Sequence, residues 1–544
     1  MAWTQVYDPM GNLGLSALVA AIPVIVIFYL LAVRRSSGQV AGGVAVVSAV
    51  LVAILFYKMP VATALTATGV GALYGVFPIF WIVITAIFLY NMTVETGQFE
   101  IIKDSVASIT DDRRLQALLI AFAFGAFLEG SAGFGTPVAI SAGMLVGLGF
   151  NPLYAAGLCL IANTAPVAFG AIGIPIIVAG QVSGLDTMKI SQMVGRQLPF
   201  LSVLIPIYLV VLMAGWKAML EVLPACIVAG VAFAGLQYFS SNFLGPELPD
   251  ILSSLACIVA LTAFLRVWKP KNIWRFPGEK AINSNQAPQA HSHTFGQVMK
   301  AWSPFIILTA MVILWGLKPV QAVLDAVSIK WAVPGLDKMI IQVAPIAKKA
   351  VAMGAVFKFN YLSAAGTALF FASILSALIL GIGMSQYINL LVKTFKQLVK
   401  PLITIPCVLG LAYIMNYSGM SSTLGLYLAG TGSFFPFFAP ILGWIGVFLT
   451  GSDTSANALF SNLQVVTAQQ VGVDPVLTVA ANSSGGVTGK MISPQSIAVA
   501  TAATGLVGHE GDLFRFTVFH SIGLAIVVGV MTYLQAYVFS WMIP

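Results

Sequence analysis

The chain has 544 residues, of which 59% are hydrophobic and only 8% are charged. Its mean hydropathy of +0.95 excludes a water-soluble globular protein, because so few polar side chains could not cover a wetted surface. The net charge of +8 comes from Lys and Arg scattered through short loops, so we expect no nucleic-acid binding. We therefore expect an all-α polytopic membrane protein surrounded by the lipid bilayer.

Apolar segments long enough to cross a bilayer recur along the whole chain. A spanning helix needs roughly 20 apolar residues, and windows bounded by charges, Pro or Gly predict about twelve crossings. Arg34 and Arg35 follow the first window, which we interpret as an uncleaved span and not a signal peptide. With these arginines in the cytoplasm, both termini face outward, and most loop Lys and Arg residues fall inside. The predicted spans are 13–33, 39–57, 63–91, 152–180, 199–215, 218–238, 250–265, 303–317, 363–383, 401–416, 475–505 and 516–541.

Two further apolar stretches, 115–150 and 436–473, are each interrupted midway by a cluster of Gly, Ser and Thr with one acidic residue. Broken backbone at membrane depth must be buried in protein or line a watery cavity, so we interpret both as re-entrant hairpins. The polar segment 267–300 predicts a flexible cytoplasmic linker between two halves. The first half, 1–266, then contains the first hairpin, and the second half, 301–544, contains the second.

The two halves share an order of landmarks. Each has an Asn, then Gly-Ser at the hairpin interruption, then a residue pair ending in Pro, then Ala-Asn and a tail broken by glycines. The predicted topology lets the first hairpin enter from the cytoplasm and the second from outside. We therefore expect an inverted-repeat transporter with broken helices meeting at the midplane. The landmarks are Asn91, Gly130-Ser131, Asn151-Pro152 and Ala162-Asn163-Thr164 in the first half, and Asn416, Gly451-Ser452, Asp474-Pro475 and Ala481-Asn482-Ser483 in the second.

The hairpin interruptions are suited to binding an anion. Residues 129–137 read EGSAGFGTP and residues 451–457 read GSDTSAN. Glycines permit a tight turn, and the half-helix that follows presents free N–H groups and a positive dipole end. The alternative interpretation is that these small residues only let helices pack closely. The occurrence of two such clusters at matching places in the two halves makes this alternative less favoured. The expected substrate contacts are Ser131, Gly133, Gly135, Thr136, Ser452, Thr454 and Ser455, with Asn163, Thr164, Asn482 and Ser483 completing a polar cage.

Four ionisable residues fall within the predicted membrane segments. Such a side chain costs about 2.5–3.5 kcal/mol at a helix centre, so a functional role is the first hypothesis. Glu221 follows Lys217 by one helical turn and is assigned to an interfacial pair. Glu129 lies in a Phe-rich setting that disfavours a free carboxylate, which makes it the first candidate proton carrier and Asp453 the second. Asp453 could instead cap the following half-helix. Lys490 could bind a substrate carboxylate or neutralise Asp453, and both interpretations stay open.

The remaining chemistry-bearing residues suggest neither a metal site nor an enzyme. The four cysteines lie singly in apolar segments, and the four histidines do not cluster with them. We expect buried thiols, no metal and no cofactor. The sequence contains no H-E-x-x-H motif and offers no nucleophile–base pair at membrane depth, so we expect a protein that is not an enzyme.

At these residues the chain resembles the L-lactate permease family, a bacterial group of monocarboxylate–proton symporters. The resemblance implies import of L-lactate, together with D-lactate and glycolate, driven by protons across the bacterial inner membrane. Independently of it, one buried Lys and no Arg at membrane depth favour a single carboxylate over a dicarboxylate or phosphate. The alternative is a sodium-coupled carboxylate transporter or an anion exchanger, and the oligomeric state stays open. The stretches that resemble the family are 129–137, 162–166, 451–457 and 488–495.

Overall fold

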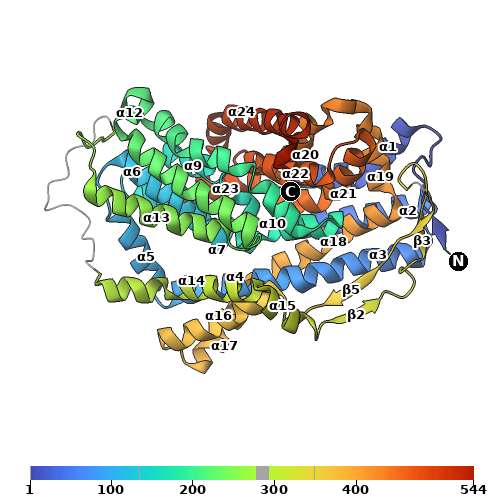
Figure 1. Ribbon diagram of the computed structural model, residues 1–544, viewed down its shortest axis with the longest axis horizontal. Helices are drawn as coiled ribbons and strands as arrows, with labels where there is room; N and C mark the ends of the chain where they lie inside the picture. The colour runs from blue at the N-terminus through green and yellow to red at the C-terminus, as the bar shows by residue number, and fades with distance from the viewer. Residues whose placement is uncertain (1, 134, 277–292, 348) are drawn as a thin grey trace.

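The computed structural model describes residues 2–133, 135–276, 293–347 and 349–544, which are mainly helical. Figure 1 shows long helices side by side along the molecule, with the N-terminus and the strands at one end and the start of α14 at the other. Within the described residues, ten helices are long and apolar enough to cross a membrane, or up to eleven with one bent pair. The multi-pass helical fold is confirmed, whereas the number twelve stays a prediction.

The described helices and strands divide between the two predicted halves. The first half consists of β1 (Trp3–Thr4), α1 (Leu13–Phe28), α2 (Gly38–Leu55), α3 (Val61–Tyr74), α4 (Trp81–Glu95), α5 (Gln98–Ala107), α6 (Arg113–Ala117), α7 (Gly125–Ser131), α8 (Thr136–Gly147), α9 (Pro152–Ala162), α10 (Gly170–Ser183), α11 (Thr187–Val194), α12 (Leu198–Phe243) and α13 (Pro249–Val267). The second consists of α14 (Phe295–Gly316), α15 (Lys318–Asp325), β2 (Ile329–Ala332), β3 (Ile340–Gln342), β4 (Val351–Ala352), β5 (Val356–Phe359), α16 (Ala365–Leu380), α17 (Met384–Gln397), α18 (Val399–Ser418), α19 (Met420–Leu428), α20 (Phe435–Thr450), α21 (Asp453–Val471), α22 (Pro475–Lys490), α23 (Pro494–Thr504) and α24 (Glu510–Tyr537).

The spans predicted at 199–215 and 218–238 are confirmed as two helices within α12, which folds back on itself at Gly215 (φ 82°, ψ 169°), so that Ser202 donates to Gln237 at 2.7 Å. Three other boundaries are wrong. The predicted span 63–91 is broken between α3 and α4, where Phe77 is extended (φ −141°, ψ 127°) before Pro78. The tail predicted to break at 484–490 stays helical in α22 and ends after Lys490. Residues 295–300 of the predicted linker belong to α14, and residues 277–292 lie outside the described chain.

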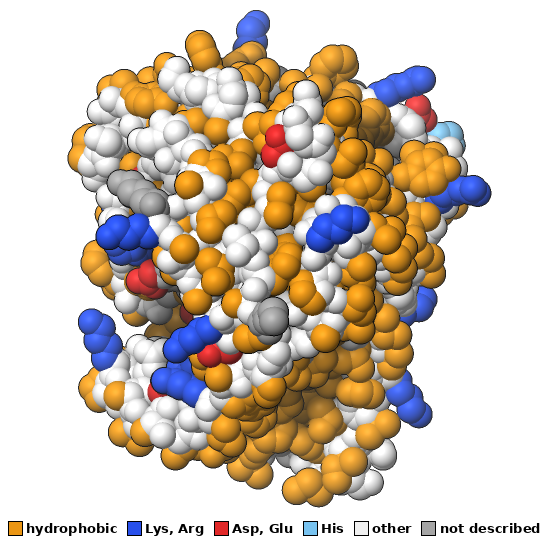
Figure 2. Space-filling view, turned by 90° about the vertical axis from the view of Figure 1, so that its right-hand side faces the viewer, with side chains coloured by type: hydrophobic (Ala, Val, Ile, Leu, Met, Phe, Trp, Pro, Cys, Tyr) orange, Lys and Arg blue, Asp and Glu red, His pale blue; other side chains and the backbone are white. Residues whose placement is uncertain are grey.

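Apolar side chains cover much of the outer surface, as a protein surrounded by lipid requires. Figure 2 shows hydrophobic side chains spread over one flank, with Lys and Arg scattered among them. Leu18, Val47 and Leu65 are 63%, 59% and 57% exposed, which would be costly in water and is favourable against lipid tails. The surface therefore agrees with the bilayer expected from composition.

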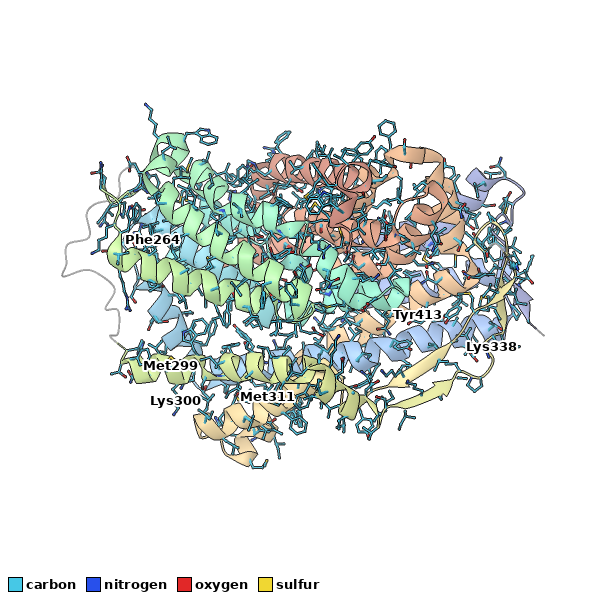
Figure 3. All side chains as sticks on the ribbon, viewed as in Figure 1. Phe264, Met299, Lys300, Met311, Lys338 and Tyr413 are labelled. Carbon is cyan, nitrogen blue, oxygen red and sulfur yellow. The ribbon has the colours of Figure 1, made fainter. Side chains whose placement is uncertain are left out.

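Five short strands near the N-terminus were not expected from the sequence. β2 pairs with β5 in an antiparallel hairpin, and β3 joins β1 in parallel and β4 in antiparallel fashion. The Lys358 ammonium donates to Asp325 at 2.7 Å, and this hydrogen bond lowers the pKa of Asp325. Lys338 beside the strands and Lys300 near the start of α14 lie at opposite ends of the molecule (Figure 3), as the predicted topology requires.

Each predicted hairpin contacts the other half of the chain. In the first, α8 packs against α23, and in the second, α21 packs against α10. The inverted orientation of the two halves stays a prediction.

A buried ion pair anchors the start of the first hairpin. Arg114 is fully buried and binds both carboxylate oxygens of Asp112, at 3.0 and 2.7 Å. It also donates to Glu221 at 2.9 Å, so Arg114, and not Lys217, is the partner of Glu221 that the structure shows. Arg114 lies at the first turn of α6, and the sequence could not reveal a partner more than a hundred positions away.

Replacing Arg114 with alanine should destabilise the protein by about 3–5 kcal/mol, because it leaves the buried Asp112 carboxylate without its counter-charge. Thermal unfolding of the purified protein in detergent measures the loss. The control is Lys103→Ala, which removes an i,i+3 pair with Glu100 at 2.6 Å and should cost less than about 1 kcal/mol because Glu100 is exposed. Equal unfolding temperatures for the two variants would contradict the anchoring role.

Candidate functional site

The two hairpin breaks meet at one cavity. The first break separates α7 from α8, and the second separates α20 from α21. Both breaks contribute to the lining of a cavity of about 70 Å³. The structure therefore brings together two clusters that lie more than three hundred positions apart in the sequence. The lining residues are Glu129, Gly133, Gly135, Val167, Gly170, Ala171, Pro175, Gly451, Ser452, Asp453, Thr454, Lys490, Gln495, Ser496 and Val499.

Helix N-termini open onto this cavity. Gly135 (φ 86°) precedes α8 and Ser452 precedes α21, and both residues line the cavity. Gln495 and Ser496, in the first turn of α23, line it as well. The positive dipole ends of three half-helices thus lie at the same cavity, an arrangement that favours an anion.

An ion pair between the two halves forms one wall. Lys490 at the end of α22 donates to Glu129 Oε1 at 2.9 Å, and Asn163 donates to Glu129 Oε2 at 3.0 Å. The side chains of Glu129 and Lys490 are 3% and 12% exposed. The direct partner of Lys490 is therefore Glu129, whereas its charge acts on Asp453 without a hydrogen bond to that carboxyl group. Lys490 nevertheless lines the cavity, where a ligand could reach it.

Asp453 lines the same cavity and lies within a network of neutral side chains. Its Oδ2 accepts from Ser483 at 2.5 Å and from Asn457 at 3.3 Å. Its Oδ1 has no hydrogen-bond partner among the described residues. The cap of α21 is Ser452, whose hydroxyl accepts from the Ser455 N–H at 3.2 Å. The interpretation of Asp453 as the helix cap is therefore wrong.

The other predicted contacts divide into those near the cavity and those behind it. Asn163 and Ser483 do not line the cavity, but they donate to the carboxyl groups of Glu129 and Asp453, which do. Asn482 binds Asn457 at 2.9 Å and serves the network behind Asp453. Ser131 is 1% exposed and donates to the Leu128 carbonyl at 3.4 Å, away from the lining. The N–H of Ser455 is used in the cap of α21. Thr164 is buried. The side chain of Thr136 lies outside the described part of the chain.

The glycine-broken tail predicted after Asn163 is confirmed. Ala171, Ile172 and Gly173 form a left-handed turn (φ 46°, 60° and 71°) at the start of α10; non-Gly residues in this region store strain, which is common at functional sites.

One feature of the site escaped the sequence analysis. Asp250 lies in the first turn of α13 and is 1% exposed. It begins the predicted span 250–265. A Pro-Asp pair at such an edge has the pattern of an ordinary helix start, so only the tertiary structure reveals its burial.

Gly170 leaves the space that the Glu129 carboxyl group occupies. A Cβ at position 170 would lie 2.6 Å from Glu129 Oε1. Gly170→Ala should therefore displace Glu129 from Lys490 and destabilise the protein by about 1–3 kcal/mol, because the crowded side chains must shift. Thermal unfolding of the purified protein in detergent measures this effect. Gly147→Ala in α8, where a Cβ meets nothing within 4 Å, is the control, and equal unfolding temperatures for both variants would contradict the assignment.

A family model and the sequence relatives agree on one family. The family model described as L-lactate permease matches residues 16–539. "Glycolate permease GlcA" of Escherichia coli (strain K12) is 56% identical over 557 residues, and "L-lactate permease" of Bacillus subtilis (strain 168) is 56% identical over 568 residues. Each alignment covers 100% of both chains. Among solved structures, MtrF of Neisseria gonorrhoeae, described as an antimetabolite efflux pump, has a TM-score of 0.47 and 13% identity over 88% of this chain and 83% of its own.

Proposed function

Because the chain belongs to the L-lactate permease family, we propose that it imports L-lactate, D-lactate and glycolate in symport with protons. The family makes the protein a transporter rather than an enzyme. With its ten or more apolar helices, it is a multi-pass protein of the bacterial inner membrane. The names of its relatives support lactate and glycolate as substrates. Beyond these substrates, the proposal adds the proton as the coupling ion and names the residues that bind it.

The observation that carries the proposal is the Glu129–Lys490 ion pair in the wall of a cavity between the hairpin breaks. A substrate carboxylate that enters the cavity competes with Glu129 for the Lys490 ammonium. Glu129 then loses its counter-charge, and a bare carboxylate is costly away from water. Taking up one proton neutralises Glu129, so one anion and one proton enter together with no net change in buried charge. Asp453, which lines the same cavity, is the second candidate proton carrier.

The composition of the cavity favours a small monocarboxylate. Lys490 supplies one positive charge, whereas a dicarboxylate or phosphate generally requires Arg or several cations. Ser452 and Thr454 line the same cavity and offer hydroxyl groups to the substrate carboxylate or to the 2-hydroxyl group that lactate and glycolate share. The cavity is small, at about 70 Å³. These features support a substrate of a few non-hydrogen atoms.

Uptake of labelled L-lactate into proteoliposomes under imposed gradients tests the function. We expect accumulation when the lumen is more alkaline than the outside, with or without sodium. Collapse of the pH gradient by a protonophore should abolish accumulation, and liposomes without protein provide the background. Accumulation that follows an inward sodium gradient and ignores pH would contradict proton symport and favour the sodium-coupled alternative. Uptake that requires only an opposing anion gradient would instead indicate an exchanger.

A further inference from the structure

Asp250 is a third buried carboxyl group beside the Glu129–Lys490 pair. It lies in the first turn of α13, which packs directly on α7 at Gly130. A Cβ at Gly130 would lie 2.6 Å from the Asp250 Cβ, so α13 approaches α7 at the residue next to Glu129. Both Glu129 and Lys490 act on Asp250 electrostatically. The close approach places Asp250 within electrostatic range of the Glu129–Lys490 pair. The sequence analysis did not include Asp250 among the site residues.

The surroundings of Asp250 favour its neutral, protonated form. It is 1% exposed, and neither carboxyl oxygen has a hydrogen-bond partner among the described residues. An ionised carboxylate without donors is far more costly to bury than a neutral acid. The Lys490 ammonium donates to Glu129 at 2.9 Å and to neither oxygen of Asp250. The other charged groups around it are Glu129 itself on α7 and Glu247, which precedes Asp250 by three positions and is partly exposed.

We propose that Asp250 is the proton donor to Glu129, a relay residue that passes the coupling proton on when substrate takes Lys490. The O–H bond of Asp250 breaks and an O–H bond forms on Glu129, which leaves Asp250 as a carboxylate and Glu129 neutral. Asp250 then takes a proton from bulk solvent, so one proton enters for each monocarboxylate. This inference rests on the proposed proton symport and adds the source of the proton to it.

The position of Asp250 is suited to this task. It follows the connection between α12 and α13, which the predicted topology places outside, so the proton would come from the side from which lactate is imported. Intramembrane acids that carry protons commonly form such chains. A structural acid would instead be expected to have donors for its oxygens, and those of Asp250 have none among the described residues.

The test measures proton uptake by purified wild-type protein after rapid mixing with L-lactate in weakly buffered detergent solution with a pH-sensitive dye. Asp250→Asn should slow the proton uptake at least about tenfold and leave its amplitude unchanged, because Glu129 remains the final acceptor. In vesicles it should slow uptake driven by a pH gradient while counterflow exchange of labelled lactate continues. Ser254→Ala is the control, one turn further along α13, where the hydroxyl donates only to the Ile251 carbonyl at 3.0 Å.

The outcomes distinguish failure of the proposed proton symport from failure of the proposed relay. Wild-type protein that takes up no proton with lactate would contradict the proposed symport itself. Equally fast proton uptake in wild type and in Asp250→Asn would overturn the relay alone. Loss of the proton-uptake amplitude in Asp250→Asn would also overturn it, because Asp250 would then be the final acceptor. If Asp250→Asn does not fold, Asp250→Glu retains an acid in an altered position and should shift the pH dependence of the rate. An unchanged pH profile in that variant would also overturn the relay.

Discussion

Lys490→Ala should raise the lactate concentration for half-maximal uptake by about 10- to 100-fold. The reason is the loss of a hydrogen bond between the ammonium and the substrate carboxylate, since such bonds to charged groups contribute about 1.5–3 kcal/mol and each 1.4 kcal/mol is tenfold in affinity. Initial rates of labelled lactate uptake measure the constant. Lys393→Ala is the control, because this lysine is 66% exposed and pairs with Glu95 on the surface.

The same variant should also be less stable, because Glu129 is left buried without its partner, at a cost of about 3–5 kcal/mol. The double variant Lys490→Met with Glu129→Gln removes both charges and should recover most of the unfolding temperature, yet remain defective in uptake. An unchanged half-saturation constant in Lys490→Ala, together with lost stability, would show that the ion pair is purely structural. Comparison of stability and affinity therefore separates substrate binding from folding.

Glu129→Gln should abolish accumulation of lactate against its gradient while counterflow exchange of labelled lactate continues. Glutamine retains the size of the side chain and its hydrogen bonding to Asn163, but it cannot take up a proton. Accumulation ratios under an imposed pH gradient and exchange in preloaded vesicles are the two measurements. Glu95→Gln, whose carboxyl group is 46% exposed in its pair with Lys393, is the control.

Uphill accumulation retained by Glu129→Gln would remove Glu129 from the coupling step and direct attention to Asp453. Loss of both accumulation and exchange, in protein that folds normally, would indicate that Glu129 positions Lys490 without carrying the proton. The amplitude of proton uptake distinguishes Glu129 from Asp250, because only replacement of the final proton acceptor should abolish that amplitude. The two acids therefore have different expected signatures at one site.

The general architecture follows from features that local sequence displays directly. A chain this apolar must lie in the membrane, and glycine-rich clusters at 130–135 and 451–452 must interrupt helices, because few other residues adopt the required backbone. The matching order of clusters in the two halves pointed to a shared site, and both breaks line one cavity. Repetition was thus a better guide than either cluster alone.

Side-chain partners and helix continuity could not be predicted in the same way. Lys490 pairs with Glu129 across 361 positions, and nothing local distinguishes that partner from Asp453. Hydropathy is continuous through Phe77-Pro78, so the break between α3 and α4 has no compositional signal. The opposite error occurred in α22, where Ser484 to Gly489 has the composition of a broken helix, yet packing against α20 keeps it regular. Tertiary contacts decided each of these features.

A cryo-electron microscopy structure of the protein with L-lactate tests the central claim most directly. The account predicts density for one small ligand between Gly135 and Ser452, with its carboxylate within hydrogen-bond distance of Lys490 and with Glu129 released from that ammonium. Density for lactate elsewhere, or in this cavity with the Glu129–Lys490 pair still closed at 2.9 Å, would contradict it.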